Sequence, residues 1–344
     1  MKKKYVSGIQ YLLVFGLGVF LIWWQLRSLN KEQEEAFRSA LKQANYWLII
    51  PIVIMTAAAH LSRAIRWKLL MEPLGFNPKT SNTFFVIMIG YLANSAVPRL
   101  GEILKCTFLA RYEKLPIDKL MGTMVVERAF DLICYFIFIL ITLIIQMDVA
   151  GDYFWQLVKP VFSSSGFGLW IKAGILISII ALLFLLLRYI FNAFPNNRMV
   201  QKVHTFYNHL LEGLKSIRNL KQRKAFIIHT LFIWIMYLLQ IYLGFFAMKG
   251  TSSLGITAAF SVLTFVTLAM IITPGGIGSF PIFVAKTLGI YAIAYPIGIA
   301  FGWLMWGITT GIILVIGGIC LLLIPVFNKN NNHESNISHP IQNI

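Results

Sequence analysis

Apolar segments of uneven length constrain the fold of this chain more than any other feature of its sequence. About 20 consecutive apolar residues are needed to cross the hydrocarbon layer of a membrane as an α-helix. The segments lie at 7–26, 45–62, 82–98, 100–112, 121–147, 169–191, 225–247, 255–273, 277–294 and 296–325. Several are too short to cross, and exposed backbone is not tolerated in hydrocarbon. The pattern predicts an all-α membrane helix bundle with about six full spans and two broken or re-entrant helical hairpins.

The positions of the basic residues indicate how these segments are threaded. Charged residues form 12% of the chain, but the formal net charge is +17, and lysines and arginines lie in short loops beside the apolar segments. Such an excess marks the cytoplasmic side of a membrane protein. If 82–98 crossed and 100–112 did not, the basic residues of 105–119 and 188–224 would lie outside. A hairpin that enters as 82–98 and returns as 100–112 keeps both regions cytoplasmic, and two full crossings would do the same.

A second pair of segments, 255–273 and 277–294, supports the same interpretation. The turn between them contains a proline and three glycines, which do not continue a helix. Its sequence is Thr273-Pro274-Gly275-Gly276-Ile277-Gly278. The expected topology has hairpins that enter from opposite faces of a bacterial inner membrane, with both chain termini in the cytoplasm. One transmembrane domain would cover 1–327, followed by a disordered cytoplasmic tail at 328–344.

Two connections and the last span allow further expectations. The mixed-charge stretch 27–44 predicts a short external helix, and 192–224 predicts either an amphipathic helix on the cytoplasmic membrane surface or a solvated connection. The last span carries glycine pairs four residues apart, which let helices approach closely. Packing within the bundle is the preferred interpretation, and homodimerisation is the alternative. The glycines are Gly298, Gly302, Gly307, Gly311, Gly317 and Gly318.

Several function classes are not supported by the sequence. The basic residues follow the membrane segments, so nucleic-acid binding is not expected. Cys106, Cys134 and Cys320 have no zinc or redox spacing, and the histidines have no metal-ligand spacing. The sequence has no nucleophile elbow, Walker loop, zinc-protease motif or dinucleotide fingerprint. We therefore expect that the protein binds no metal ion or cofactor and is not an enzyme.

Ionisable residues inside the apolar region are the strongest functional signal. Each Asp, Lys or Arg at mid-helix costs about 2.5–3.5 kcal/mol on membrane-insertion scales, so such residues need a compensating role. Glu127, Arg128 and Asp131 share consecutive turns of one helix. Arg99 or Lys105 from the preceding hairpin is the expected additional cation. The set could be an ion network that locks the hairpin or a polar cavity that holds a lipid headgroup, and the two roles are compatible.

The turn of the first hairpin offers a site for an anion. The returning helix begins near Gly101, so its unpaired N–H groups and positive dipole end would lie within the membrane beside Arg99. Broken helices bind anions in this way in transporters. The second turn repeats the device, with Ser279 near an inward helix start and Lys286 about two turns along. The residues predicted to contact a headgroup are Arg99, Gly101, Glu102, Lys105 and Ser279.

Other polar residues are expected to have structural roles. Asn94 would bind backbone groups freed by the turn, and Gln240 would form a hydrogen bond between helices. His60, Arg63 and Arg66 end the second span and would extend to headgroup phosphates. The residues predicted to form the two turns or hinges are Asn94, Pro98, Pro274, Gly275, Gly276 and Gly278.

Several of these residues carry a resemblance to a known family. The stretch Tyr91-Leu-Ala-Asn-Ser-Ala-Val-Pro-Arg-Leu-Gly-Glu102 is followed by Glu127-Arg-Ala-Phe-Asp131. Together with Arg63-Ala-Ile-Arg66-Trp67 and the 273–278 turn, they resemble the membrane domain of lysylphosphatidylglycerol synthases over about residues 10–325. Two departures stand out. Val97-Pro98-Arg99 lacks the glycine usually found between the proline and the arginine, and Pro281 stands where the family often has a glutamate.

The resemblance implies a lipid-handling role. In the synthases this domain is taken to translocate an aminoacylated anionic lipid that a separate soluble domain makes. The same membrane domain also occurs alone and in some prokaryotic glycosyltransferases. No aminoacyl-transferase domain fits within these 344 residues, so no synthase role is implied.

The leading hypothesis is a flippase-like translocator of an anionic phospholipid or lipid-linked precursor. A second is a non-transporting partner that presents lipids to a glycosyltransferase or another cell-envelope enzyme. A third is an intramembrane enzyme that uses Glu127 or Asp131 as a base, although no motif supports it.

Overall fold

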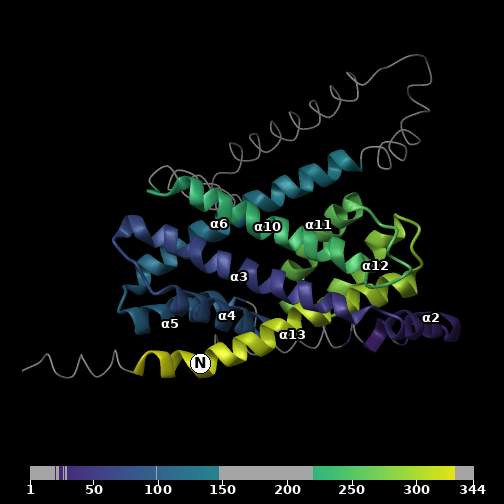
Figure 1. Cartoon of the computed structure of the whole chain (residues 1–344), viewed down its shortest axis with the longest axis horizontal. Coiled ribbons are helices and arrows are strands. Elements are labelled where there is room, and N and C mark those ends of the chain that lie inside the picture. The colour runs from purple at the N-terminus through teal and green to yellow at the C-terminus, as the bar shows by residue number, and fades with distance from the viewer. Residues whose placement is uncertain are drawn as a thin grey trace, which may run out of the picture. The chain divides into compact units, whose positions relative to one another are not determined.

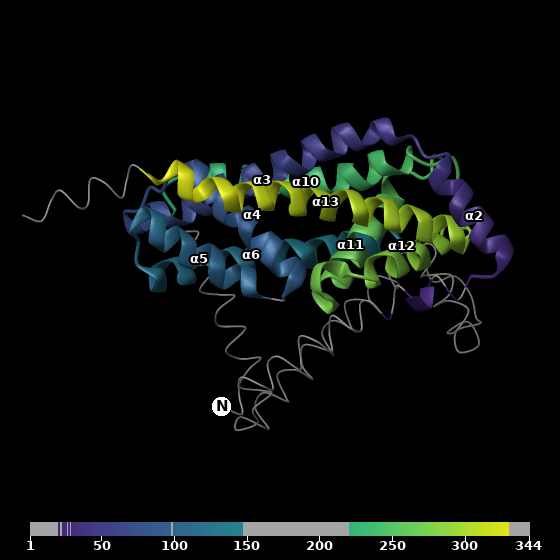
Figure 2. The same cartoon turned by 90° about the horizontal axis from the view of Figure 1, so that it is seen from below.

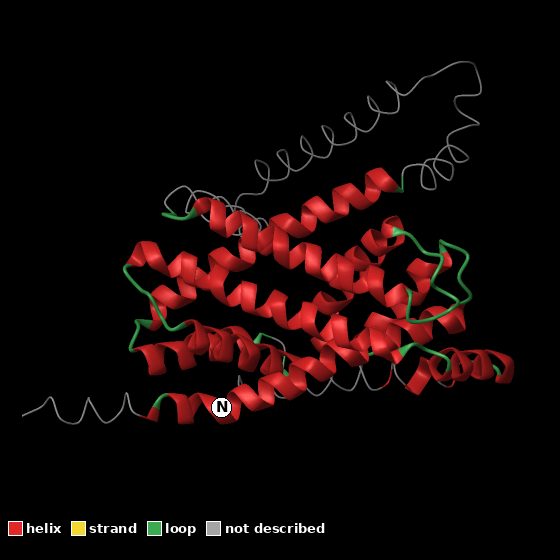
Figure 3. Ribbon diagram, viewed as in Figure 1, coloured by secondary structure: helices red, strands yellow, loops and turns green. Residues whose placement is uncertain are grey.

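The chain folds into helices throughout the part that the computed structural model describes (Figures 1 and 3). The described residues are 20, 23–25, 27, 29–97, 99–146 and 220–329. The predicted all-α membrane bundle is therefore confirmed. The spans expected at 7–26 and 169–191, and the stretch 192–224, lie wholly or mostly outside the described residues. The chain divides into two compact units, one formed by 1–127 with 217–344 and the other by 128–216.

Four helices among the described residues are long and apolar enough to cross a membrane. They are α3 (Ile49–Met71), which short 3-10 turns extend at both ends, α6 (Ile117–Ile145), α10 (Arg223–Phe245) and α13 (Tyr295–Phe327). The chain is thus a multi-pass membrane protein. A polar helix, α2 (Lys31–Lys42), occupies the stretch predicted to form a short external helix. Asn30 and Gln33 form a capping box at its start, which satisfies backbone N–H groups there.

Two pairs of shorter helices are broken where the sequence predicted turns. The first hairpin consists of α4 (Thr80–Ala96) and α5 (Leu100–Glu113). The second consists of α11 (Ile256–Ile272), the 3-10 turn η3 (Pro274–Gly276) and α12 (Ser279–Gly289).

A proline ends the entering helix of each hairpin. Val97 follows α4 with φ −135° and ψ 117°, and Thr273 follows α11 with φ −120° and ψ 146°. Each of these residues precedes a proline, whose ring disfavours helical backbone at the preceding position. The same local rule therefore breaks both helices.

The two hairpins enter the first unit from opposite ends, as Figures 1 and 2 both show. The returning helices have 14 residues in α5 and 11 in α12. At 1.5 Å per residue they rise only about 21 Å and 16 Å. A bilayer core is about 30 Å thick, so neither returning helix is long enough to cross it.

Hydrogen bonds tie the open end of the first hairpin to the end of α13. The Asn82 side chain, in α4, donates to Glu113 of α5 at 2.6 Å and to Asn328 at 2.9 Å. Asn328 donates back to Asn82 at 2.8 Å and is buried, although the sequence placed it in a disordered tail. We call this the basic end, because the described lysines and arginines near it include Lys68, Lys79, Arg111, Lys114, Lys119 and Lys329.

The tips of the two hairpins meet inside the first unit. A Cβ atom placed on Gly275 would lie 3.5 Å from Cα and 3.7 Å from Cβ of Ser95, which is in the last turn of α4. Two side chains hold the second tip: Trp306 Nε1 of α13 donates to the Gly275 carbonyl at 2.8 Å, and Gln25 Nε2 donates to the Gly278 carbonyl at 2.6 Å. We call the approach of Gly275 to Ser95 the hairpin junction.

The glycines of α13 divide into two sets. A Cβ atom on Gly298 or Gly302 would lie under 3 Å from the backbone of α12, and one on Gly317 would press on Leu92 of α4. These three glycines therefore let α13 pack closely on both hairpins, as the sequence predicted. At Gly307, Gly311 and Gly318, no other described part of the chain lies within 4 Å of the Cβ position.

Candidate functional site

A buried carboxylate gathers three cations from two other helices. Glu127 of α6 is fully buried, and its Oε2 accepts a hydrogen bond from Lys105 Nζ of α5 at 2.7 Å. Its Oε1 lies 3.4 Å from Arg63 Nη1 and 3.4 Å from Arg66 Nη2, both of α3. The prediction that a cation from the hairpin reaches the acidic helix is confirmed for Lys105. We call these four residues the ion cluster.

A shell of hydroxyl groups and aromatic rings surrounds the ion cluster. Arg63 donates to Tyr237 and Arg66 to Thr230, both of α10 and both at 3.4 Å. Lys105 Nζ lies 4.4 Å from the centre of the Trp67 ring, a geometry that favours cation–π attraction. Four helices, α3, α5, α6 and α10, are thereby joined through one carboxylate in a region from which water is largely excluded.

The structure corrects the expectation that Arg63 and Arg66 extend to headgroup phosphates. Arg66 is 0% and Arg63 6% exposed, and both lie inside α3, which continues to Met71. The sequence analysis placed them at the end of a span, because the apolar segment ends near residue 62. Their spacing of three, which puts both on one face of a helix, was the signal that they share a partner.

Asn94 closes the first tip. Its Oδ1 accepts the backbone N–H of Gly101 at 2.7 Å, and its Nδ2 donates to Glu102 Oε1 at 3.3 Å. The role predicted for Asn94 is confirmed. Gly101 is buried and its N–H is already bonded, so this group does not contact a headgroup in this conformation. Gly101 also packs so closely on Gly90 that a Cβ atom would overlap the Gly90 carbonyl oxygen.

Arg99 is the exposed cation of the first tip. It directly precedes α5 in the left-handed region, with φ 65°, a conformation that glycine adopts more readily. Its side chain is exposed and makes no ion pair or hydrogen bond within the described part of the chain. The neighbouring Pro98 lies outside the described residues.

The second tip contains no charged side chain. Ser279 begins α12 as expected, but it is buried, and its hydroxyl lies 2.5 Å from Thr273 Oγ1 and donates to the Ala269 carbonyl at 3.2 Å. The structure thus gives Ser279 the role of closing the turn rather than of holding a headgroup. Gly275, Gly276 and Gly278 all have positive φ, as a turn of this kind requires.

The remaining predicted residues lie on α12 and on α6. Lys286 of α12 is exposed. Arg128 and Asp131 continue α6 beyond Glu127, are half-buried, and belong to the second unit. Pro281 of α12 is buried; a Cβ atom on Gly302 would lie 2.6 Å from its Cα.

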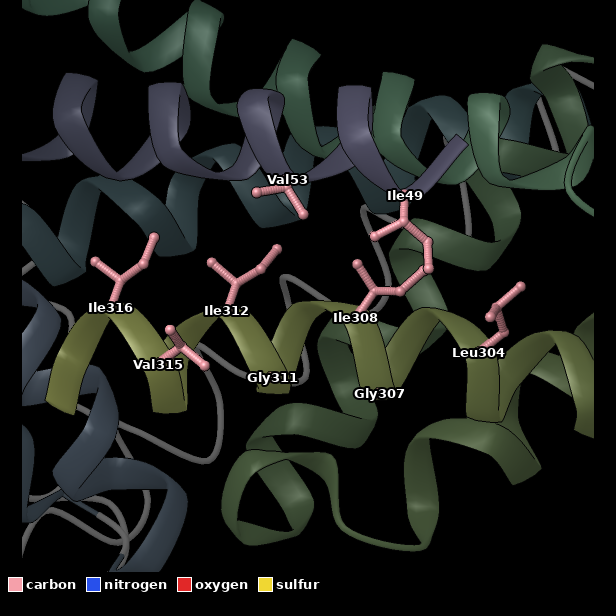
Figure 4. Close-up of a pocket in the computed structure, with 9 residues that line it drawn as sticks. All are labelled: Ile49, Val53, Leu304, Gly307, Ile308, Gly311, Ile312, Val315 and Ile316. Atoms are coloured by element: carbon pink, nitrogen blue, oxygen red, sulfur yellow. The ribbon is translucent and has the colours of Figure 1, made fainter. Parts of the chain in front are cut away.

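An apolar groove of about 550 Å³ runs between α3 and α13 (Figure 4). None of its lining residues is charged, and Gly307 and Gly311 contribute no side chain to it. The groove therefore resembles a lipid-facing surface rather than a polar site. Its lining residues are Ile49, Val53, Leu304, Gly307, Ile308, Gly311, Ile312, Val315 and Ile316.

Comparisons with known proteins find similarity to membrane proteins over most of the chain. A family model described as the lysylphosphatidylglycerol synthase TM region matches residues 11–318. A UPF0104 membrane protein of Methanocaldococcus jannaschii is 23% identical over 227 residues, a stretch that covers 62% of this chain and 66% of that protein. The match therefore spans slightly less than two thirds of that relative's length. No solved structure matches the chain.

Proposed function

The chain belongs to the family of the lysylphosphatidylglycerol synthase transmembrane region, and from that premise we propose that it binds an anionic phospholipid or lipid-linked precursor and moves the headgroup across the membrane. The hairpin junction is the point at which the headgroup would pass. Access from alternate sides would come from the two hairpins, which enter from opposite ends.

The proposal rests on one observation, the exposed side chain of Arg99 at the tip of the first hairpin. The exposed guanidinium of Arg99 lies at the hairpin tip, separated from the basic end by the length of α5, about 21 Å. At that depth in hydrocarbon, a cation is costly unless an anion approaches it. Its planar fork suits a phosphate group. Arg99 is therefore the residue we assign to the headgroup phosphate.

The ion cluster would support this site without contacting the headgroup. Lys105 lies in the second turn of α5 and is bonded to Glu127, so it anchors the returning helix that Arg99 precedes. A rigid α5 keeps Arg99 in place, because the position of a cation at a helix start depends on the helix behind it. The ion cluster thus serves as the anchor of the first hairpin.

The orientation follows from charge. We propose that the basic end faces the cytoplasm of a bacterial cell and that the protein lies in the inner membrane, with both chain termini inside. Among the described residues, the opposite end carries Glu32, Glu34 and Glu35 on α2 beside its lysines and arginines, and these acidic residues reduce its basic excess.

Exchange of a labelled lipid between leaflets tests the proposal. The purified protein is placed in vesicles that contain a fluorescent anionic phospholipid, and a membrane-impermeant quencher reports the outer-leaflet fraction over time. Arg99→Gly removes the cation and suits the positive φ, so it should slow exchange about tenfold, the value of one charged hydrogen bond. Arg99→Lys should retain most of the rate.

Arg111→Ala is the matched control, because Arg111 is also exposed on α5 but lies at the basic end. It should leave the exchange rate unchanged. Equal rates for Arg99→Gly and the unmodified protein would contradict the assignment of Arg99. Lipid binding without any exchange would instead favour the alternative, a partner that presents lipids to a cell-envelope enzyme.

A further inference from the structure

A ladder of buried polar side chains joins α3 to α10 within the membrane-spanning part of the first unit. Thr56 lies 3.2 Å from Gln240, and Arg63 lies 3.4 Å from Tyr237, each measured between the bonded atoms. Thr56, His60 and Arg63 are four and three residues apart, so they lie on one face of α3. His60 is therefore bracketed by the two contacts on either side of it.

His60 is the step of this ladder that has no partner on α10. It is 4% exposed, and its Nδ1 has no hydrogen-bond partner among the described residues. Its ring lies against Tyr91 of α4, with the ring centres 4.7 Å apart. A buried imidazole nitrogen left unbonded in hydrocarbon is strongly unfavourable, so its presence needs an explanation.

Gln240, which contacts Thr56 one turn before His60, has an amide nitrogen without a hydrogen-bond partner among the described residues. It is 4% exposed, and its Nε2 has no partner within the described ranges. The hydroxyl of Thr56 has one proton and also lies 2.7 Å from the Ile52 carbonyl, so it cannot donate to both oxygens. Turning the amide over would let Nε2 donate to Thr56, but it would leave the carbonyl oxygen unbonded instead. One end of the amide lacks a protein partner in either case.

We propose that His60 and Gln240 form an internal binding site for a hydroxyl group, supplied by water or by a lipid headgroup. A hydroxyl group both donates and accepts, so it can bond the imidazole nitrogen and either end of the amide. Buried waters occupy sites of this kind, where polar groups lack protein partners. The site is separate from Arg99 and does not depend on lipid translocation.

The position of the site gives it a functional consequence. Arg63, the next step of the ladder, belongs to the ion cluster, and Tyr91 lies one turn before Ser95 of the hairpin junction. An occupied site would extend the polar interior from Glu127 towards the hairpin tips.

Solid-state NMR of protein labelled with ¹⁵N-histidine tests the proposal in vesicles. Magnetisation is transferred from water protons to the imidazole nitrogens, and the His60 signal is assigned by its loss in His60→Phe. The full chain is measured in phosphatidylcholine alone and with added phosphatidylglycerol, which carries headgroup hydroxyls. Transfer to His60 in both vesicles identifies water, and transfer only with phosphatidylglycerol identifies the headgroup. No transfer in either vesicle overturns the proposal.

A second arm tests whether the two residues share the ligand. Gln240→Met should abolish the transfer to His60, while Ile233→Val, another buried position of α10, should not. His229 provides an internal reference, because its Nδ1 lies 2.8 Å from Ser62 Oγ and its signal should not change in either variant. Unchanged transfer to His60 in folded Gln240→Met protein would show that Gln240 is not part of the site.

Discussion

The two hairpins have the same backbone plan but opposite chemistry. In each, a proline ends the entering helix, a residue with positive φ turns the chain, and a short helix returns to the end where the hairpin began. The first tip carries Arg99, Asn94 and Glu102 and is anchored by Lys105 on Glu127. The second is built from glycines, two hydroxyl groups and contacts from Trp306 and Gln25.

This difference assigns the hairpins different roles. Charge in a membrane interior is costly, so it is retained where it does something that neutral groups cannot. The second hairpin packs on α13 through Gly298 and Gly302 and holds its tip against Ser95. We therefore propose that the second hairpin, whose tip is uncharged, serves to pack the bundle, and that the tip of the first hairpin contacts the headgroup.

The strongest test joins the two tips covalently. Cysteines at 95 and 275 would have Cβ atoms about 3.7 Å apart, close to the mean for disulfides. In a background without Cys106, Cys134 and Cys320, oxidation should stop leaflet exchange completely, and reduction should restore it. The single Ser95→Cys protein, treated identically, is the control. Continued exchange by the crosslinked protein would mean that headgroups do not pass between the tips.

The next largest effect is expected at the anchor of the first hairpin. Glu127→Leu removes the carboxylate that three buried cations share, so it should cost about 3–5 kcal/mol and much of the folded protein. Thermal unfolding in detergent measures the loss. Glu34→Gln, which breaks the exposed pair with Arg38 on α2, should cost about 1 kcal/mol or less. Similar losses in the two variants would contradict a buried anchor.

Glycine substitutions compare the packing of the two hairpins. Gly101→Ala and Gly302→Ala each force a Cβ atom into neighbouring backbone, so each should cost about 1–3 kcal/mol. Only Gly101→Ala should also reduce lipid binding per folded molecule, because it moves the tip that carries Arg99. Gly311→Ala, with open space around its Cβ position, should be neutral or stabilising by up to about 1 kcal/mol. Loss of lipid binding in folded Gly302→Ala protein would contradict the prediction that only the first hairpin tip contacts the lipid.

The smallest effects should come from the side chains that close the turns. Asn94→Leu removes the acceptor of the Gly101 N–H and should cost about 1–2 kcal/mol. Ser279→Ala removes one hydroxyl from the second turn and should cost about 1 kcal/mol. Thermal unfolding ranks the two, and a larger loss for Ser279→Ala would reverse the expected order.

Much of the secondary structure could be predicted from local rules. The breaks after Val97 and Thr273 follow from the prolines that come next. The need to balance Glu127 and Asp131 predicted a cation from the hairpin, either Arg99 or Lys105, and the structure pairs Lys105 with Glu127. The structure departs at Arg63 and Arg66, which pair with a residue more than 60 positions away. A membrane helix is apolar on most of its surface, so hydrophobic periodicity does not reveal which face is turned inwards.

Within the described residues, the sequence by itself determined which stretches are helical and where the hairpins turn, and its motifs indicated the membrane family. The helices and turns depend on backbone hydrogen bonding in hydrocarbon and on proline and glycine geometry, and both are local properties. The tertiary structure decided which groups meet: Glu127 with Arg63, the two hairpin tips at Ser95 and Gly275, and the His60 ring with Tyr91. Such encounters depend on the rotation and close packing of whole helices, to which residues far apart in the chain contribute together.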